Sequence, residues 1–182
     1  MYQPDNYHRE FWLRGPVPGI PKELQPVAHA LLQAQKEINL GIAAFPDEYL
    51  WNKPAGLASV GFHLQHIRGV LDRLFTYAEG KMLNDQQMDE LKKEGTPYDN
   101  NDTLANLIDL LNAQLEITMK KLAAIDPGTL ADKSFVGRDR IETTRAGLLF
   151  HAAEHTMRHT GQLLVTVKLS HLFSAEGVEV SR

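Results

Sequence analysis

Apolar residues recur along much of this chain at the three- and four-residue spacing of amphipathic helices. The first such segment runs from Lys22 or Pro26 to Phe45, and its apolar stripe comprises Leu24, Val27, Leu31, Ile38, Ile42 and Phe45. A second segment begins after Ser59, whose hydroxyl can cap the first turn, and stops at Gly80. Its stripe comprises His63, Ile67, Val70, Leu71, Leu74 and Tyr77. Pro54, in the turn between the two segments, disfavours helix at the residue before it.

Two further helical segments follow in the second half of the chain. The third starts near Asp102 and ends at Asp126, and it presents Leu104, Leu107, Ile108, Leu111, Leu115 and Leu122. The fourth starts at Thr143 or Thr144 and ends near Leu169. Leu148, His151, Ala152, His155, His159, Gln162 and Leu163 share one of its faces, and other apolar residues lie around the rest of its circumference. Such a helix is usually covered by more than one neighbour.

The connections between these segments contain little regular structure. Asn84 and Gln87 have the spacing of a capping box for a short helix that Gly95 would close. The loop after Gly128 spans about fifteen residues, which is long enough to have a function of its own. No strand pattern exceeds a few residues. The pattern therefore predicts an all-α fold, a bundle of four main helices.

Composition restricts the class of protein further. A length of 182 residues suggests one domain over residues 1–182, with an N-terminal extension of about residues 1–21. The net charge is -4, and lysines and arginines are scattered rather than clustered with aromatic residues, so we expect no nucleic-acid partner. There is no run of eighteen apolar residues and no continuous apolar stretch near Met1, so we expect no membrane segment and a cytoplasmic location.

The chain contains no cysteine, which excludes disulfides, cysteine metal sites and a thiol nucleophile from the protein. Its chemistry is concentrated instead in histidines. His155 and His159 are four residues apart on the fourth helix, so their imidazoles can reach one metal ion. A third nitrogen must come from another helix, and His66 lies on or beside the inward stripe of the second.

Three histidines with open coordination positions are typical of a catalytic metal site rather than a structural one. Because three neutral ligands leave the charge of a divalent ion uncompensated, the open position favours a hydroxide, a thiolate or a carboxylate. The expected cofactor is a divalent metal ion such as zinc, nickel, iron or manganese, and affinity alone does not choose among them. A single inward histidine is more often a core residue than a ligand, so the clustering carries this prediction.

Other residues near these histidines leave alternatives open. His63 and His151 could be extra ligands, partners of the ligands or packing residues. Gly161 could permit close approach of a helix, and Gln162 could orient a ligand. Arg138, Arg140 and Arg145, near the start of the fourth helix, could attract an anionic substrate or simply be solvated.

The segment His151-Ala152-Ala153-Glu154-His155 also matches the inverted signature of zinc proteases, in which Glu154 would be the general base. A five-residue pattern arises easily by chance, the chain is small for such a protease, and a carboxylate ligand would be needed elsewhere. A di-iron carboxylate site would require two Glu-x-x-His motifs, and the sequence has none.

Two motifs resemble those of the DinB/YfiT-like metal-dependent hydrolase superfamily. The stretch from Ser59 to Ile67 is similar to its second-helix motif, where a serine cap precedes the first histidine ligand by seven residues. The stretch from His155 to Gln162 is similar to its second motif, a histidine pair followed by a residue and Gly-Gln. Trp51–Pro54 fits the lead-in, and the likeness covers about residues 26–170. Phe62 and Thr160 depart from the family pattern, since an acid and an arginine are common there.

The resemblance implies a DinB/YfiT-like four-helix bundle whose metal ligands are His66, His155 and His159. It also implies a metal-dependent enzyme that acts on a small molecule, either a transferase using a low-molecular-weight thiol or a hydrolase, and a homodimer. The alternative is a non-enzymatic metal-binding protein of a stress response.

Overall fold

The computed structural model describes residues 8–98 and 102–175 and confirms the all-α prediction. Five helices make up most of this part: α1 (Gln25–Ile42), α2 (Val60–Ala78), α3 (Asp85–Lys93), α4 (Leu104–Ala123) and α5 (Arg145–Ala175). Two short antiparallel strands, β1 (Lys133–Val136) and β2 (Ile141–Thr144), form a hairpin before α5. None of the helices in the described ranges is long and apolar enough to cross a membrane.

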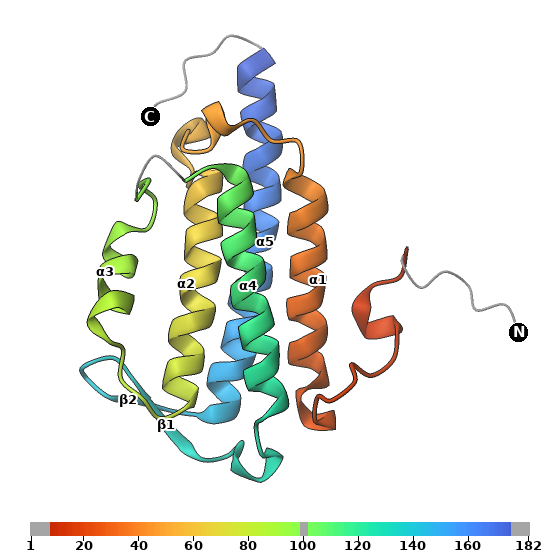
Figure 1. Cartoon of the computed structure of the whole chain (residues 1–182), viewed down its shortest axis with the longest axis vertical. Helices are drawn as coiled ribbons and strands as arrows, with labels where there is room; N and C mark the ends of the chain where they lie inside the picture. Colours follow the sequence, from red (N-terminus) through yellow and green to blue (C-terminus); the bar gives the residue numbers. More distant parts are fainter. Residues whose placement is uncertain (1–7, 99–101, 176–182) are drawn as a thin grey trace, which may run out of the picture.

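The four long helices form the bundle, and the short helix α3 lies outside it beside α2 (Figure 1). α2 packs against both α4 and α5, and α1 packs against the same two helices, so the order around the bundle is α1, α5, α2, α4. The predicted stripes face its core: Leu31, Ile67, Leu111 and Leu163 are each at most 2% exposed. Burial of these stripes supplies most of the driving force for folding.

The predicted helix starts are present. The Ser59 hydroxyl accepts a hydrogen bond from the Phe62 backbone N–H at 3.1 Å, which caps α2. Asn84 and Gln87 form a reciprocal capping box at the start of α3. Because both caps use only neighbouring residues, the sequence was sufficient to predict them.

The segment before α2 packs against its first turn through Trp51. A Cβ atom at Gly61 would lie only 2.6 Å from the Trp51 ring, so glycine is needed for this close approach. The Gly61 N–H also donates to the Leu50 carbonyl at 2.8 Å. These contacts set the direction in which the chain enters α2, and α2 carries the first of the candidate ligands.

The structure departs from the expectations in three places. The long loop after Gly128 contains the β-hairpin, which the sequence pattern did not predict because its strands are only four residues long. The inward face predicted for the fourth helix is only partly buried: Leu148 and Leu163 are in the core, whereas His151 and Gln162 are exposed. α5 also continues past the expected end at Leu169. A helix that packs on α1 and α2 at once has two apolar faces, so a single stripe describes it poorly.

Candidate metal centre

The structure brings together His66 of α2 with His155 and His159 of α5. One ring nitrogen of each lies within 4.8 Å of one nitrogen of both others. Nε2 of His66 is 2.9 Å from Nε2 of His155, and the rings of His155 and His159 have centroids 4.5 Å apart. All three side chains are partly buried. The cluster forms because α2 and α5 pack side by side and because residues four apart share a helix face.

His63 lies one turn before His66 and borders this cluster without joining it. It is 3% exposed, and its Nδ1 lies 3.1 Å from Nδ1 of His159. Of the roles that the sequence left open for His63, the geometry therefore favours a hydrogen-bonding partner of a ligand. One of the two facing nitrogens must carry the proton, so His63 can set the tautomer of His159.

A carboxylate that the sequence did not indicate orients His66. Glu94, which follows α3, lies with Oε2 2.6 Å from Nδ1 of His66, and its side chain is 7% exposed. A carboxylate only accepts hydrogen bonds, so Nδ1 of His66 donates to it, and Nε2 is the nitrogen that faces the other histidines. Pairing of this kind is the usual support of a metal-binding histidine.

Arg73 holds Glu94 in turn. Its Nη1 lies 2.8 Å from Oε1 of Glu94, an ion pair whose geometry falls short of a directed hydrogen bond. Arg73 is 8% exposed and follows His66 by seven residues, so the two share a face of α2. A Cβ atom at Gly69 would collide with both Arg73 Nη1 and Glu94 Oε1, so this glycine makes room for the pair.

Gln65 ties the loop that carries Glu94 to α2. Its side-chain oxygen accepts from the Gly95 N–H at 2.8 Å, and its amide nitrogen donates to the Thr96 carbonyl at 3.0 Å. Gly95 has φ +90°, a conformation that side chains other than glycine disfavour. Gly95, which the sequence predicted to end the short helix, thus also turns the chain so that Glu94 faces His66.

Phe62 forms an apolar wall of the cluster. Its ring stacks on His66 with centroids 5.0 Å apart and an interplanar angle of 13°. It also approaches the ring of His159, at 6.3 Å between centroids. Phe62, one of the two residues that depart from the family pattern, therefore restricts the movement of the His66 ring and shields it from water.

The surroundings favour the neutral form of His63, His155 and His159. Burial, helped by the neighbouring His66, lowers the pKa of His63 from its ordinary value of 6.5 to about 4. Burial and the nearby His66, His155 and His63 lower the pKa of His159 to about 3. The pKa of His155 is also lowered, chiefly by burial. Neutral imidazoles keep the lone pairs that a metal requires.

These pKa values make the stability of the metal-free protein depend on pH. Between about pH 4 and 6.5, His63 and His159 bind protons in the unfolded chain but remain largely unprotonated in the folded protein. We therefore expect the free energy of unfolding, measured in urea, to fall as the pH drops from about 7 toward 4 and to be nearly constant above about pH 7.5. In His63→Gln the slope should be smaller. An unchanged slope would show that His63 does not titrate as the structure implies.

The donor set fits a divalent ion. Tetrahedral coordination at about 2.0–2.1 Å places imidazole nitrogens about 3.3 Å apart, close to the 2.9 Å between His66 and His155. Nδ1 of His155, which is not the nitrogen that faces His66, is buried without a hydrogen-bond partner among the described residues. His66, His155 and His159 could therefore hold such an ion, with His63 and Glu94 supporting them.

His151, Glu154 and His155 form a second group that could contact a metal, as the protease-like motif predicts. This group lies on a single helix and is more open, since the His151 side chain is 50% exposed. Glu154 is paired with Arg158 and lies 3.5 Å from Nδ1 of His151. A base held in an ion pair on the helix surface is poorly placed for catalysis, and the three-histidine group remains the better site.

The other sequence candidates take different places. Arg145 donates to the Ala78 carbonyl at 2.9 Å and to the Thr129 hydroxyl, so it anchors the start of α5. Arg140 lies over the Phe135 ring, and Arg138 is exposed. Arg145 precedes His155 by ten residues, about 15 Å along the helix, so it does not border the cluster. The idea that Gly161 permits a close helix approach is wrong, since a Cβ there would meet no atom within 4 Å.

Fold and site together define a class of protein: a helical bundle with three histidines converging from two helices. The model of the DinB superfamily matches residues 20–163, and the chain belongs to this family. A solved structure of a conserved protein from Enterococcus faecalis is similar, with a TM-score of 0.64 and 20% identity over 81% of this chain and 96% of that one. That likeness concerns the fold. No curated protein matches the chain.

Proposed function

We propose that this protein is a metal-dependent enzyme, a transferase that attaches a low-molecular-weight thiol to an electrophilic small molecule. The observation that carries the proposal is the convergence of His66, His155 and His159 from two helices. Three protein ligands leave coordination positions for a substrate.

The residues of the chain would share the work as follows. The three histidines would hold the ion, and Glu94 would keep the lone pair of His66 directed at it. Phe62 would limit access of water from one side. A divalent ion bound there supplies a positive charge that lowers the pKa of a thiol and holds its sulfur for attack.

Two points favour a thiol over water as the reacting partner. The family resemblance of the two histidine motifs includes thiol-dependent transferases. The chain has no cysteine, so no protein thiolate competes for the ion or for the electrophile.

The test is a turnover assay with purified protein loaded separately with zinc, nickel, iron or manganese. Thiol and electrophile are supplied together, and the loss of free thiol is measured; the cysteine-free protein contributes no background. Consumption of thiol that depends on metal and on His159 supports a transferase. Turnover without thiol would identify a hydrolase, and stoichiometric metal without turnover would indicate a non-enzymatic metal-binding protein.

Glu154 distinguishes the three-histidine site from the protease-like one. We expect Glu154→Gln to retain metal and most of the activity, because Glu154 pairs with Arg158 at the surface. Loss of a general base typically costs 10²–10⁴-fold in rate, which a simple assay detects. A fall of that size, together with retained metal in His159→Ala, would make His151, Glu154 and His155 the site instead.

We also propose a homodimer, on the basis of apolar residues left uncovered on α5. Phe150 is 68% exposed and Leu172 is 58% exposed, although side chains of this kind are usually buried. Light scattering should give a mass of about twice 20.5 kDa at micromolar concentration. We expect Phe150→Asp to shift the equilibrium toward the monomer. A wild-type mass near 20.5 kDa would contradict the proposal.

A further inference from the structure

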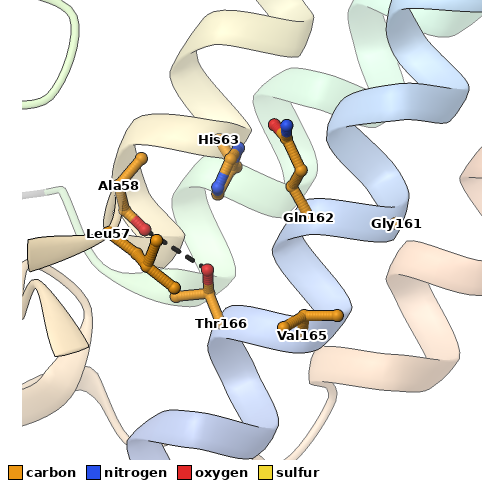
Figure 2. Close-up of a pocket in the computed structure, with 7 residues that line it drawn as sticks. All are labelled: Leu57, Ala58, His63, Gly161, Gln162, Val165 and Thr166. Carbon is orange, nitrogen blue, oxygen red and sulfur yellow. Dashed lines mark hydrogen bonds between the residues drawn. The ribbon is translucent and has the colours of Figure 1, made fainter. Parts of the chain in front are cut away.

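A groove of about 440 Å³ lies between the segment before α2 and the middle of α5 (Figure 2). Leu57 and Ala58 form one wall, Gly161 and Val165 belong to the other, and His63 closes one end. The volume is within the range of small-molecule sites, about 300–1,000 Å³.

The groove adjoins the histidine cluster. His63 belongs to its lining, and Nδ1 of the same side chain lies 3.1 Å from Nδ1 of His159. Gly161 follows His159 by two residues on α5. His63 is therefore shared between the groove and a candidate metal ligand.

The lining selects an uncharged ligand. None of the described residues that line the groove carries a carboxylate, an amine or a guanidinium. Leu57 and Val165 are 44% and 54% exposed, so an apolar molecule between them would remove apolar surface from water. An ionic group would lose hydration there without gaining a charged partner.

One hydrogen bond and one glycine shape the groove. The Thr166 hydroxyl donates to the Ala58 carbonyl at 3.3 Å and ties the first wall to α5, as Figure 2 shows. Gly161 contributes no side chain, and a Cβ atom there would meet no atom of the described residues within 4 Å. The same observation supplies a probe: because Gly161 lines the groove and a Cβ atom there has open space, we expect a leucine side chain at this position to extend into the groove.

We propose that this groove binds the uncharged, largely apolar body of the substrate, whose reacting group lies at the histidine cluster. The inference that the groove binds such a molecule rests only on the residues that line it. The placement of the reacting group rests on the proposed function. The substrate class is then a small neutral molecule with an aromatic or alkyl body, as opposed to an anionic metabolite.

The experiment follows the methyl NMR signals of Leu57 and Val165 in full-length protein supplied with zinc, with the metal content measured on the same sample. Benzyl alcohol is the neutral probe, and benzoate is its charged match. Gly161→Leu fills the groove, and Ala113→Leu adds the same side chain at an exposed position of α4. Phenylmethanethiol carries the same body with a sulfur in place of the hydroxyl oxygen, so it tests whether the reacting group meets the ion.

Benzyl alcohol should shift both sets of methyl signals saturably in the wild type and in Ala113→Leu. Benzoate, and benzyl alcohol with Gly161→Leu, should bind at least about tenfold more weakly. Phenylmethanethiol should bind at least about tenfold more tightly than benzyl alcohol when zinc is present. Equal binding of these two to zinc-loaded protein would overturn the placement beside the cluster.

No saturable shift in the wild type would overturn the whole inference. So would shifts that follow protein concentration without any probe, because the groove would then be a contact between two copies of the chain. If zinc does not bind but benzyl alcohol still shifts the methyl signals, the groove stands and the proposed function fails. The two proposals can therefore be refuted separately.

Discussion

Replacing His66, His155 or His159 with alanine should abolish stoichiometric metal binding, and each single replacement should suffice. One nitrogen of each lies within 4.8 Å of the others, so losing one leaves two ligands on an otherwise open ion. The helices should remain, because the core is built from apolar stripes and these imidazoles are only partly buried. Elemental analysis of purified variants measures the metal, and circular dichroism measures the helicity.

His63→Ala and His151→Ala are the matched controls on the same two helices. His63 touches His159 but is outside the group, and the His151 side chain is half exposed. Both should keep far more metal than the three variants above. If one of the three variants contains as much metal as the wild type, the assignment of that histidine as a ligand is wrong.

Replacing Arg73 with methionine should lower the free energy of unfolding of the metal-free protein by about 3–5 kcal/mol, measured in urea. The substitution leaves the carboxylate of Glu94 buried without its cationic partner, and breaking a buried pair from one side costs about that much. Metal affinity should also fall by about 10–100-fold, because Glu94 would no longer be held against His66.

The double variant Arg73→Met, Glu94→Gln separates the two effects. It removes both charges, so much of the stability should return, since a buried ion pair can be replaced by neutral residues at little cost. Metal affinity should stay low, because a neutral amide supports the Nδ1–H of His66 less than a carboxylate does. If the two single substitutions add without coupling, the pair does not act as a unit.

Much of the fold could be predicted from the chain because its signals are local. The stripe of α4 has its leucines buried where the period of 3.6 placed them, and Ser59 and Asn84 cap helices through residues three positions away. The spacing of His155 and His159 likewise depends only on helix geometry. For these features, neighbours in the sequence are also neighbours in space.

The sequence by itself determined the helices and the histidines that could bind a metal. It also determined that His155 and His159 lie on the same face of their helix. Only the tertiary structure decided that His66 meets that pair, that Glu94 and Arg73 stand behind it, and that His151 and Gln162 are exposed. Glu94 lies 28 residues from His66, beyond a short helix, and no periodicity connects them. The physical reason is that the packing of α2, α3 and α5 determines which groups surround a buried charge. That packing depends on the whole core and not on the spacing of residues within any one segment.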